Sequence, residues 1–378
     1  MAAQILPLFR LVDGYLLRQL IPVIGFAVAL FTIVWLAPET LFKLTQHVFS
    51  QKISVAQGIV LFLYHLPKVL QQTIPLSVLL ATIVVFQKLS QQYELIAMMA
   101  SGIGFRRILR AVLYVGILFG LLHMAINEVL IPYAQPRLEK AKIALDLDTA
   151  DDQNFLFIEK NRHKQLDKLF LIGQIREDPL KNFIILYYTE TPKQGVQISR
   201  ILRAETGFWV AKQKRWFLKD GIEYVLNTEG VYKDIRRFDW QFVHTSRYAA
   251  KLLNASRESP LAMPFGSLQR YIKLLKAGGQ YQDVPFFEVQ LWQKITGPLA
   301  TVIFALLGCI LGIERLRTNR FFGLTFGALV VFLYSIMVPI TANFGALAIL
   351  PSFALAWLPL IFCVTMTILL QKFRPKQG

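Results

Sequence analysis

The sequence has little charge and almost no cysteine. Charged residues make up 17% of its 378 residues, whereas soluble domains carry about a quarter. The deficit lies in residues 15–132 and 285–371, which are apolar almost throughout, while residues 133–284 resemble an ordinary soluble domain. The 2 cysteines, Cys309 and Cys363, lie in apolar runs without a partner pattern, so no disulfide or metal framework is implied.

The sequence also lacks the motifs of nucleotide hydrolysis and of common hydrolases. No GxxxxGK[ST], HExxH or GxSxG pattern occurs, and Gly102-Ile103-Gly104 is not followed by the P-loop lysine. The 5 histidines are scattered without ligand spacing. We therefore expect no catalytic residue, no metal site and no cofactor bound by this chain, so that any ATP hydrolysis belongs to a separate protein.

The net charge of +17 and the pI of about 9.9 do not indicate nucleic acid as a partner. Outside the central domain, the basic residues cluster in short loops at the ends of apolar runs, as membrane topology requires. A bilayer crossing needs about 20 mostly apolar residues. Six segments are candidate spans, namely 16–37, 74–87 with an apolar lead-in from 54, 108–131, 290–313, 321–341 and 351–371.

The second span is the least regular of the six. Its lead-in contains Pro67 and Pro75, which we expect to break the helix into a kinked or interfacial approach and a true span. At the first span no small-residue cleavage site follows Ala37, which favours an uncleaved helix over a signal peptide.

The distribution of Lys and Arg predicts the orientation. One side of the membrane would hold basic residues in four separate segments, and the other side would hold few. These basic residues are Arg10, Arg18, Lys88, Arg106, Arg107, Arg110, Arg315, Arg317, Arg320, Lys372, Arg374 and Lys376. We therefore predict that both termini are cytoplasmic and that the central domain faces outward.

The central domain has the pattern of short β-strands. Alternation is clear at 222–227 and 238–243, and further strands are expected at 154–159, 168–174, 182–189, 196–205 and 207–211. Turn signals separate them at Asp178-Pro179, Pro192-Lys193, Asp220-Gly221 and Glu229-Gly230. Such spacing predicts a sandwich or jelly roll.

A short helix is expected after this domain, capped by Ser267 and ended by Gly278-Gly279. Its apolar face has two possible positions, at the bilayer surface or against the β domain.

Residues 93–104 form a short stretch of good helix formers on the predicted cytoplasmic side. Its small and methionine side chains would suit docking into a groove of a partner, although a simple connecting helix is the more economical interpretation of the residues alone. The candidate contact residues are Tyr93, Glu94, Ala97, Met98, Ala100, Ser101 and Gly102.

This stretch is similar to the coupling-helix signature of the LptF/LptG family of lipopolysaccharide-export permeases. The resemblance continues through Asp13-Gly14-Tyr15, Asn127-Glu128, Arg203-Ala204-Glu205, Trp216–Gly221, Trp292–Ile295 and Leu350-Pro351. It covers nearly the whole chain in the same order, with three helices on each side of the β domain. It implies a polytopic α-helical membrane protein of six transmembrane helices with an inserted periplasmic β-jellyroll domain between helices 3 and 4.

The resemblance also implies a function and a set of partners. Members are permease subunits of an ABC-type lipid exporter that extracts lipopolysaccharide or a similar amphiphile from the inner membrane. Two copies of an LptB-like ABC ATPase, which uses ATP and Mg, dock on the coupling helices. A second LptF/LptG-type permease or a second copy of the chain completes the cavity, and an LptC/LptA-like periplasmic bridge protein receives the lipid.

Several residues acquire expected roles from the resemblance. In the family, helices one and five form a lateral gate, and here Gly323, Gly327 and Ala328 would provide close packing in helix five. Lys43 and Lys294 are candidate lipid or headgroup contacts, although Glu39 has the wrong sign for an anionic headgroup and Lys294 could instead extend to the interface.

The expected organisation has four parts: residues 1–132 as the N-terminal membrane half, with the coupling helix near 91–104; 133–264 as the β-jellyroll domain; 265–284 as a linker with a short amphipathic helix; and 285–378 as the C-terminal membrane half. A membrane sensor or scaffold with an extracytoplasmic β ligand-binding domain is the alternative function. A secondary transporter is disfavoured, since neither internal repeats nor charges in the middle of the spans are evident.

Overall fold

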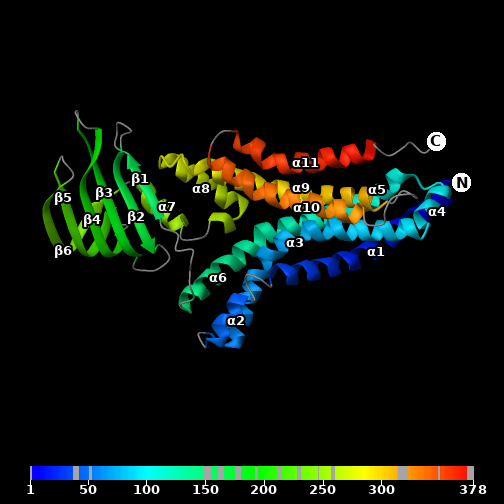
Figure 1. Cartoon of the computed structure of the whole chain (residues 1–378), viewed down its shortest axis with the longest axis horizontal. Helices are drawn as coiled ribbons and strands as arrows, with labels where there is room; N and C mark the ends of the chain where they lie inside the picture. Colours follow the sequence, from blue (N-terminus) through cyan, green and yellow to red (C-terminus); the bar gives the residue numbers. More distant parts are fainter. Residues whose placement is uncertain are drawn as a thin grey trace. The chain divides into compact units, whose positions relative to one another are not determined.

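The structure is a computed structural model of the whole chain (Figure 1). It describes residues 2–36, 42–50, 53–145, 147, 155–160, 166–174, 180–191, 195–210, 215–227, 231–245, 247–256, 260–313, 322–347 and 350–372. The chain divides into two compact units, which we call the membrane unit (Met1–Leu147 with Pro285–Gly378) and the β unit (Asp148–Val284). The turn signals near 178, 192 and 229 and the basic residues from Arg315 to Arg320 lie outside the described residues.

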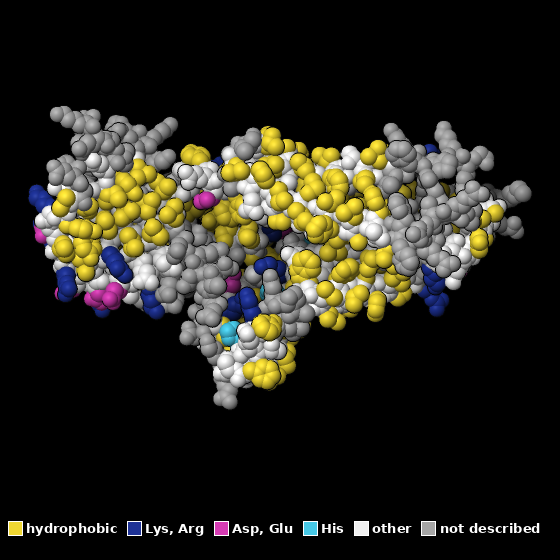
Figure 2. All heavy atoms as spheres, in the orientation of Figure 1, with side chains coloured by type: hydrophobic (Ala, Val, Ile, Leu, Met, Phe, Trp, Pro, Cys, Tyr) yellow, Lys and Arg dark blue, Asp and Glu magenta, His cyan; other side chains and the backbone are white. Residues whose placement is uncertain are grey.

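The membrane unit is a bundle of long apolar helices, and Figure 2 shows hydrophobic side chains covering much of its surface. Among the described residues, six helices are long and apolar enough to cross a bilayer. The N-terminal half consists of α1 (Ala2–Leu36), α2 (Phe42–Phe49), α3 (Val55–Gln91), α4 (Glu94–Ala100), α5 (Phe105–Ala125), the π-helix η2 (Ile126–Leu130) and α6 (Ile131–Ala144). The C-terminal half consists of α9 (Val284–Gly312), α10 (Phe322–Ala346) and α11 (Ser352–Lys372).

Helix α3 contradicts the predicted break at the second span. It continues through Pro67 and Pro75 for 37 residues, and both prolines are buried. Ser54 starts it with a capping box in which Ser54 and Gln57 bond each other's backbone N–H. A proline removes one backbone donor, but a helix is the one open-chain conformation that satisfies the remaining backbone groups in lipid, so it continues.

Helices α3 and α9 lie at the centre of the membrane unit. They are the two candidate spans with the largest buried share, 72% and 67%, against 11% for α10. Their shared core is formed with α10 and α11 and contains Leu76, Leu79, Ile83, Phe304, Leu307, Leu311, Val330 and Cys363. The described cysteines, Cys309 and Cys363, are both buried as small core residues and form no disulfide with each other.

The β unit contains one six-stranded antiparallel sheet in which each strand pairs with its neighbour in the chain. The strands are β1 (Phe155–Lys160), β2 (Leu166–Gln174), β3 (Leu180–Thr191), β4 (Gly195–Val210), β5 (Arg215–Leu226) and β6 (Tyr232–His244). The expected β domain between the third and fourth spans is therefore present. Its sequential order is that of a meander, simpler than the Greek-key order that defines a jelly roll. The two strands expected at 196–205 and 207–211 form the single strand β4.

A row of positions without a ladder partner crosses four strands. It explains why the turn predicted at Asp220-Gly221 is instead part of a strand. Asn182, Glu205, Asp220 and Asp239 each fall at a gap in the ladder between paired residues on either side. At this row two successive residues of each strand point away from the core. The alternation of inward and outward side chains therefore shifts by one residue along each strand. Asp220 takes a φ of 53° inside β5, which Asp tolerates better than most residues.

The two edges of the sheet approach each other through side-chain contacts. The Lys168 Nζ atom on β2 donates to the carbonyl oxygen of His244 at 3.2 Å, and the Thr245 hydroxyl donates to Glu159 on β1 at 3.2 Å. The sheet is therefore rolled so that its two ends approach each other, and no backbone ladder joins β1 to β6 among the described strands. At the β1 edge, the Gln280 amide donates to the carbonyl oxygen of Ile158 at 3.4 Å, which covers part of that edge.

Two helices, α7 (Arg247–Ser256) and α8 (Phe265–Ala277), follow the sheet. Helix α8 starts three residues earlier than predicted, with Pro264 as its N-cap, and Ser267 instead accepts a hydrogen bond from Arg270. Gly278 caps its end as expected. The buried Tyr271 hydroxyl lies 3.1 Å from that of Ser256 on α7, which favours packing within the β unit over a position at the bilayer surface.

Candidate functional site

The predicted coupling segment is a separate short helix between α3 and α5. Helix α4 is bounded by two residues with positive φ, Tyr93 at 60° before it and Gly102 at 91° after it. Leu95 is its one buried residue, and Ile96 and Tyr93 are largely exposed apolar side chains. A short helix with one anchor and exposed apolar side chains is suited to contact with another protein.

Helix α4 contacts the start of α1. The Tyr15 hydroxyl donates to the Glu94 carboxylate at 2.5 Å, and the Gln19 amide donates to the Tyr15 oxygen. Val12, Tyr15, Glu94, Ala97 and Met98 line an open pocket of about 390 Å³ between the two helices. The structure thus brings together three of the predicted coupling residues, with two α1 residues that were not predicted to belong to this site.

An ion pair joins α1 to the start of α5. The Arg107 Nη2 atom donates to Asp13 Oδ2 at 2.7 Å, and the two side chains are only 22% and 24% exposed. A partly enclosed pair is screened less by salt than a surface pair. Asp13 belonged to the family resemblance and Arg107 to the charge pattern, but sequence gave no spacing that would pair residues 94 positions apart.

The candidate headgroup residues lie on different elements. Lys43 is exposed on α2, in the segment between the first two spans. Lys294 is partly buried on α9, where the Glu128 carboxylate of η2 acts on its ammonium group. Lys294 therefore lies within the electrostatic influence of a carboxylate of the same chain.

A buried polar seam between α5 and α9 was not anticipated. The Nδ1 atom of His123, which is 4% exposed, lies 3.0 Å from the Thr301 hydroxyl. Asn127 is also buried, in the π-helix that continues α5. Polar side chains inside spans are costly and mark functional or packing sites, and π-helices often occur at such sites. The sequence signal was the polar sequence Asn127-Glu128 near the end of an apolar run.

The small residues of helix five behave differently from one another. Cβ atoms added to Gly323 and Gly327 would contact the carbonyl oxygen of Leu311 and the side chain of Ile83, so both glycines pack closely against α9 and α3. Ala328 is exposed. Among the described residues no group of three or more His, Cys, Asp or Glu side chains is placed to hold a metal ion.

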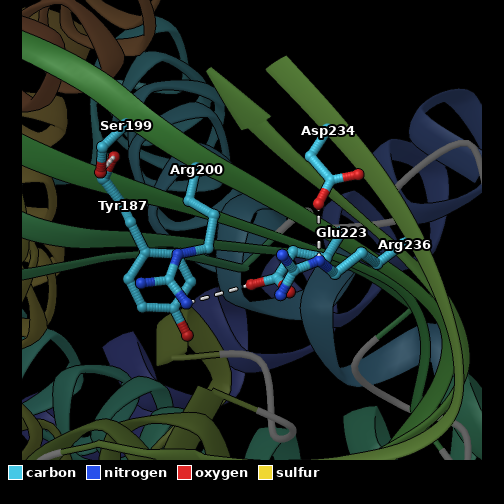
Figure 3. Close-up of polar contacts among 6 residues, drawn as sticks. All are labelled: Tyr187, Ser199, Arg200, Glu223, Asp234 and Arg236. Atoms are coloured by element: carbon cyan, nitrogen blue, oxygen red, sulfur yellow. Dashed lines mark hydrogen bonds and ion pairs between the residues drawn. The ribbon is translucent and has the colours of Figure 1, made fainter. Parts of the chain in front are cut away.

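The inner face of the β unit changes from apolar to ionic along its strands. At one end, Phe183, Trp216 and Leu218 are at most 1% exposed. At the other end lies a charged network, drawn in Figure 3, in which Arg200 pairs with Glu223 at 3.1 Å. The other residues of Figure 3 are Tyr187, Ser199, Asp234 and Arg236, with Arg236 paired to Asp234 at 2.7 Å.

Tyr187 stacks beneath the Arg200 guanidinium, whose Cζ atom lies 5.0 Å from the ring centre. Burial raises the pKa of Tyr187 to about 12, because a phenolate would lose its hydration there. The nearby Arg200 opposes this increase, whereas Glu223, Asp167 and Glu159 add to it. The inner face therefore ends in a dense set of paired charges around a neutral tyrosine.

Residues 14–372 match the model of the family described as "Lipopolysaccharide export system permease LptF/LptG". The chain belongs to the LptF/LptG family. It is 23% identical over 301 residues to the lipopolysaccharide export system permease protein LptG of Escherichia coli strain K12, covering 75% of this chain and 77% of that protein. LptG of Escherichia coli O6:H1 strain CFT073 matches to the same extent.

Membership of the LptF/LptG family confirms the prediction of a helical membrane protein with an inserted β domain and the assignment to lipopolysaccharide-export permeases. It agrees with the multi-pass architecture. Along the described chain, three apolar helices precede the antiparallel sheet and three follow it. The matched region includes the coupling segment, the His123–Thr301 seam and the whole described sheet.

Proposed function

We propose that this chain is the permease subunit of an ABC-type exporter that extracts lipopolysaccharide or a similar amphiphile from the inner membrane. A separate LptB-like ATPase dimer, using ATP and Mg, would drive it, and an LptC/LptA-like periplasmic bridge would receive the lipid. The observation that carries this proposal is the family match over residues 14–372 together with six spans and an inserted β unit.

The ATPase would dock on α4. This role is supported by the short length of α4, its single buried anchor Leu95 and the open pocket beside Ala97 and Met98. Tyr93, Glu94, Ala100, Ser101 and Gly102 complete the docking segment. The basic residues beside it, such as Arg106 and Arg110, favour a cytoplasmic position. Both termini would then be cytoplasmic and the β unit periplasmic.

The lipid would move past the spans that are least covered by the rest of the chain. The least buried candidate spans are α10, at 11% of its apolar window, and α1 and α11, at 28% each. Such exposure is what a permease that pairs with a second copy or a second LptF/LptG-type chain would require. Lys43 and Lys294 are the candidate headgroup contacts, with Lys294 already engaged by Glu128.

The test is purification of the tagged chain from native membranes in mild detergent, followed by mass spectrometry of stoichiometric partners. An ABC ATPase at equal copies per permease would support the proposal. The presence or absence of a second permease among the stoichiometric partners would show whether the chain pairs with itself. A clean homo-oligomer without ATPase in repeated preparations would contradict it and favour the sensor or scaffold function.

A matched pair of variants tests the docking segment directly. Ala97 is exposed on α4 and Ala125 is exposed at the end of α5. Ala97→Trp should release the ATPase during purification, while Ala125→Trp should retain it, and both should melt at the wild-type temperature. Retention of the ATPase by Ala97→Trp would exclude α4 as its docking site.

A further inference from the structure

The start of α1 is held from two sides by the segment that contains α4 and α5. Asp13 bonds Arg107 on α5 at 2.7 Å, and Tyr15 bonds Glu94 on α4 at 2.5 Å. Residues two apart on an α-helix point about 200° apart around its axis. The two contacts therefore grip nearly opposite faces of α1, so that neither a rotation nor a shift of α1 can occur independently of the segment 94–107.

The two elements joined by these contacts differ in how firmly the rest of the chain holds them. Helix α4 is short and has one buried residue, Leu95. Beyond its start, α1 is buried along a single stripe and exposes much of its remaining surface. That stripe contains Leu16, Leu20, Ile24 and Ala27.

We propose that Asp13, Tyr15, Glu94 and Arg107 form a clamp that transmits displacement of the ATPase-docking helix α4 to the membrane span α1. These four side chains are positioning residues for transport, and the proposal rests on the proposed function of the chain. When the docked ATPase displaces α4, the clamp makes the start of α1 move with it. Without the clamp, ATP would still be hydrolysed, but the motion would not reach the span.

The ion pair is what makes a two-sided grip effective. A hydrogen bond to one face alone would allow α1 to pivot about Tyr15. The Asp13–Arg107 pair fixes the other face, and its enclosure limits competition from salt and water. The acidic and the basic residue of this pair can be exchanged, which preserves the ion pair. Recovery of transport in the exchanged variant would distinguish an ion-pair role from a role in packing alone.

The test uses the permease with its copurified ATPase, reconstituted in phospholipid vesicles that contain fluorescently labelled rough lipopolysaccharide. ATP hydrolysis and lipid extraction to an added periplasmic acceptor are measured together. For Asp13→Asn and for Tyr15→Phe we expect hydrolysis within about twofold of wild type and about five- to tenfold less lipid extracted per ATP.

Two further variants make the result specific. Asp13→Arg combined with Arg107→Asp should restore lipid per ATP to within about twofold of wild type, whereas either single change should not. Thr32→Val is the matched control, since Thr32 is also a polar α1 residue, 3.4 Å from the Thr73 hydroxyl on α3. It should leave the ratio unchanged.

A cross-link provides an independent measurement. In a chain with Cys309→Ala and Cys363→Ala, the changes Tyr15→Cys and Glu94→Cys allow a bifunctional methanethiosulfonate reagent of matching length to join α1 to α4. Each end of the reagent forms a disulfide with one cysteine and releases methanesulfinate, so a reductant can later break the link. The unlinked protein should extract little lipid per ATP, the linked protein should recover, and reductive release should reverse the recovery. Arrest of transport by the link would show that α1 and α4 must separate, which would overturn the clamp.

The outcomes distinguish the clamp from the proposed function. If the wild-type complex hydrolyses ATP but extracts no lipopolysaccharide, the exporter proposal fails. If wild type extracts lipid and the clamp variants extract it with an unchanged ratio, the clamp alone is wrong. A lower melting temperature with equal loss of hydrolysis and extraction would assign these residues to folding and also overturn the clamp.

Discussion

The α-carbon of Gly323 faces the carbonyl oxygen of Leu311 so closely that an added Cβ would lie 2.5 Å from it. Because that oxygen belongs to the backbone of α9, it cannot move aside cheaply. We expect Gly323→Ala to destabilise the packing of α10 by about 1–3 kcal/mol. The measurement is the thermal aggregation midpoint in detergent.

Gly25→Ala is the control for this change, since no atom lies within 4 Å of the Cβ it would add on α1. It should leave the midpoint unchanged or slightly higher, because Ala is a better helix former than Gly. Equal midpoints for Gly323→Ala and wild type would show that α10 is not held at this contact.

The Glu128 carboxylate acts on the charge of Lys294, which predicts coupling between substitutions of the two residues. Lys294→Met should destabilise the chain by about 1–3 kcal/mol, because the partly buried carboxylate loses its cationic partner. The double variant with Glu128→Gln should be less destabilised than the sum of the single changes. Additive midpoints would contradict the pair.

The same double variant tests the headgroup role of Lys294. If Lys294 binds a lipid phosphate, the double variant should be stable but should retain less copurified lipopolysaccharide than wild type. If the double variant retained as much lipopolysaccharide as wild type, the role of Lys294 would be limited to the contact between η2 and α9.

The backbone at Asp220 predicts opposite results for two substitutions. Its φ of 53° costs Gly nothing and strains a β-branched side chain. Asp220→Gly should therefore preserve the melting temperature followed by tryptophan fluorescence, and Asp220→Val should lower stability by about 1–2 kcal/mol. Similar losses for both variants would show that the carboxylate, and not the backbone, is required.

Tyr187 predicts a loss of stability at alkaline pH. Its folded pKa of about 12 exceeds the ordinary value of 10.0, so between these values the unfolded chain releases a proton that the folded chain keeps. The stabilisation is complete below pH 10 and falls as pH rises through 12, by up to about 2 kcal/mol.

Thermal midpoints of the full chain at pH 9, 10 and 11 check this dependence. Tyr187→Phe should make the alkaline decrease shallower, and Tyr281→Phe, at a side chain that is 64% exposed, should not. An equally steep decrease in Tyr187→Phe would assign the effect to other groups of the β unit.

Hydropathy was sufficient to locate the six spans and the β domain, because each depends on local composition. The continuity of α3 through Pro67 and Pro75 was not predictable in this way. The local preference of proline is against a helix interior, and only the packing around α3 and the lack of water to solvate free backbone groups outweigh it.

The strand errors have a similar cause. When only the local sequence is considered, Asp-Gly between alternating residues is a strong signal of a hairpin turn. In the structure, however, Asp220-Gly221 lies inside β5, where Gly221 leaves room for the ring of Phe238 and for the carbonyl oxygen of Arg203. These contacts come from neighbouring strands, so they cannot be inferred from local pattern. The same holds for Tyr15 and Glu94, which are 79 positions apart.

The row formed by Asn182, Glu205, Asp220 and Asp239 has a consequence for variation in length. All four strands shift their alternation at the same level, so a one-residue deletion in any of them would put every later side chain of that strand out of step with the strands it pairs with. Insertions and deletions should therefore accumulate in the connections between strands, while the distance from each strand end to this row stays constant.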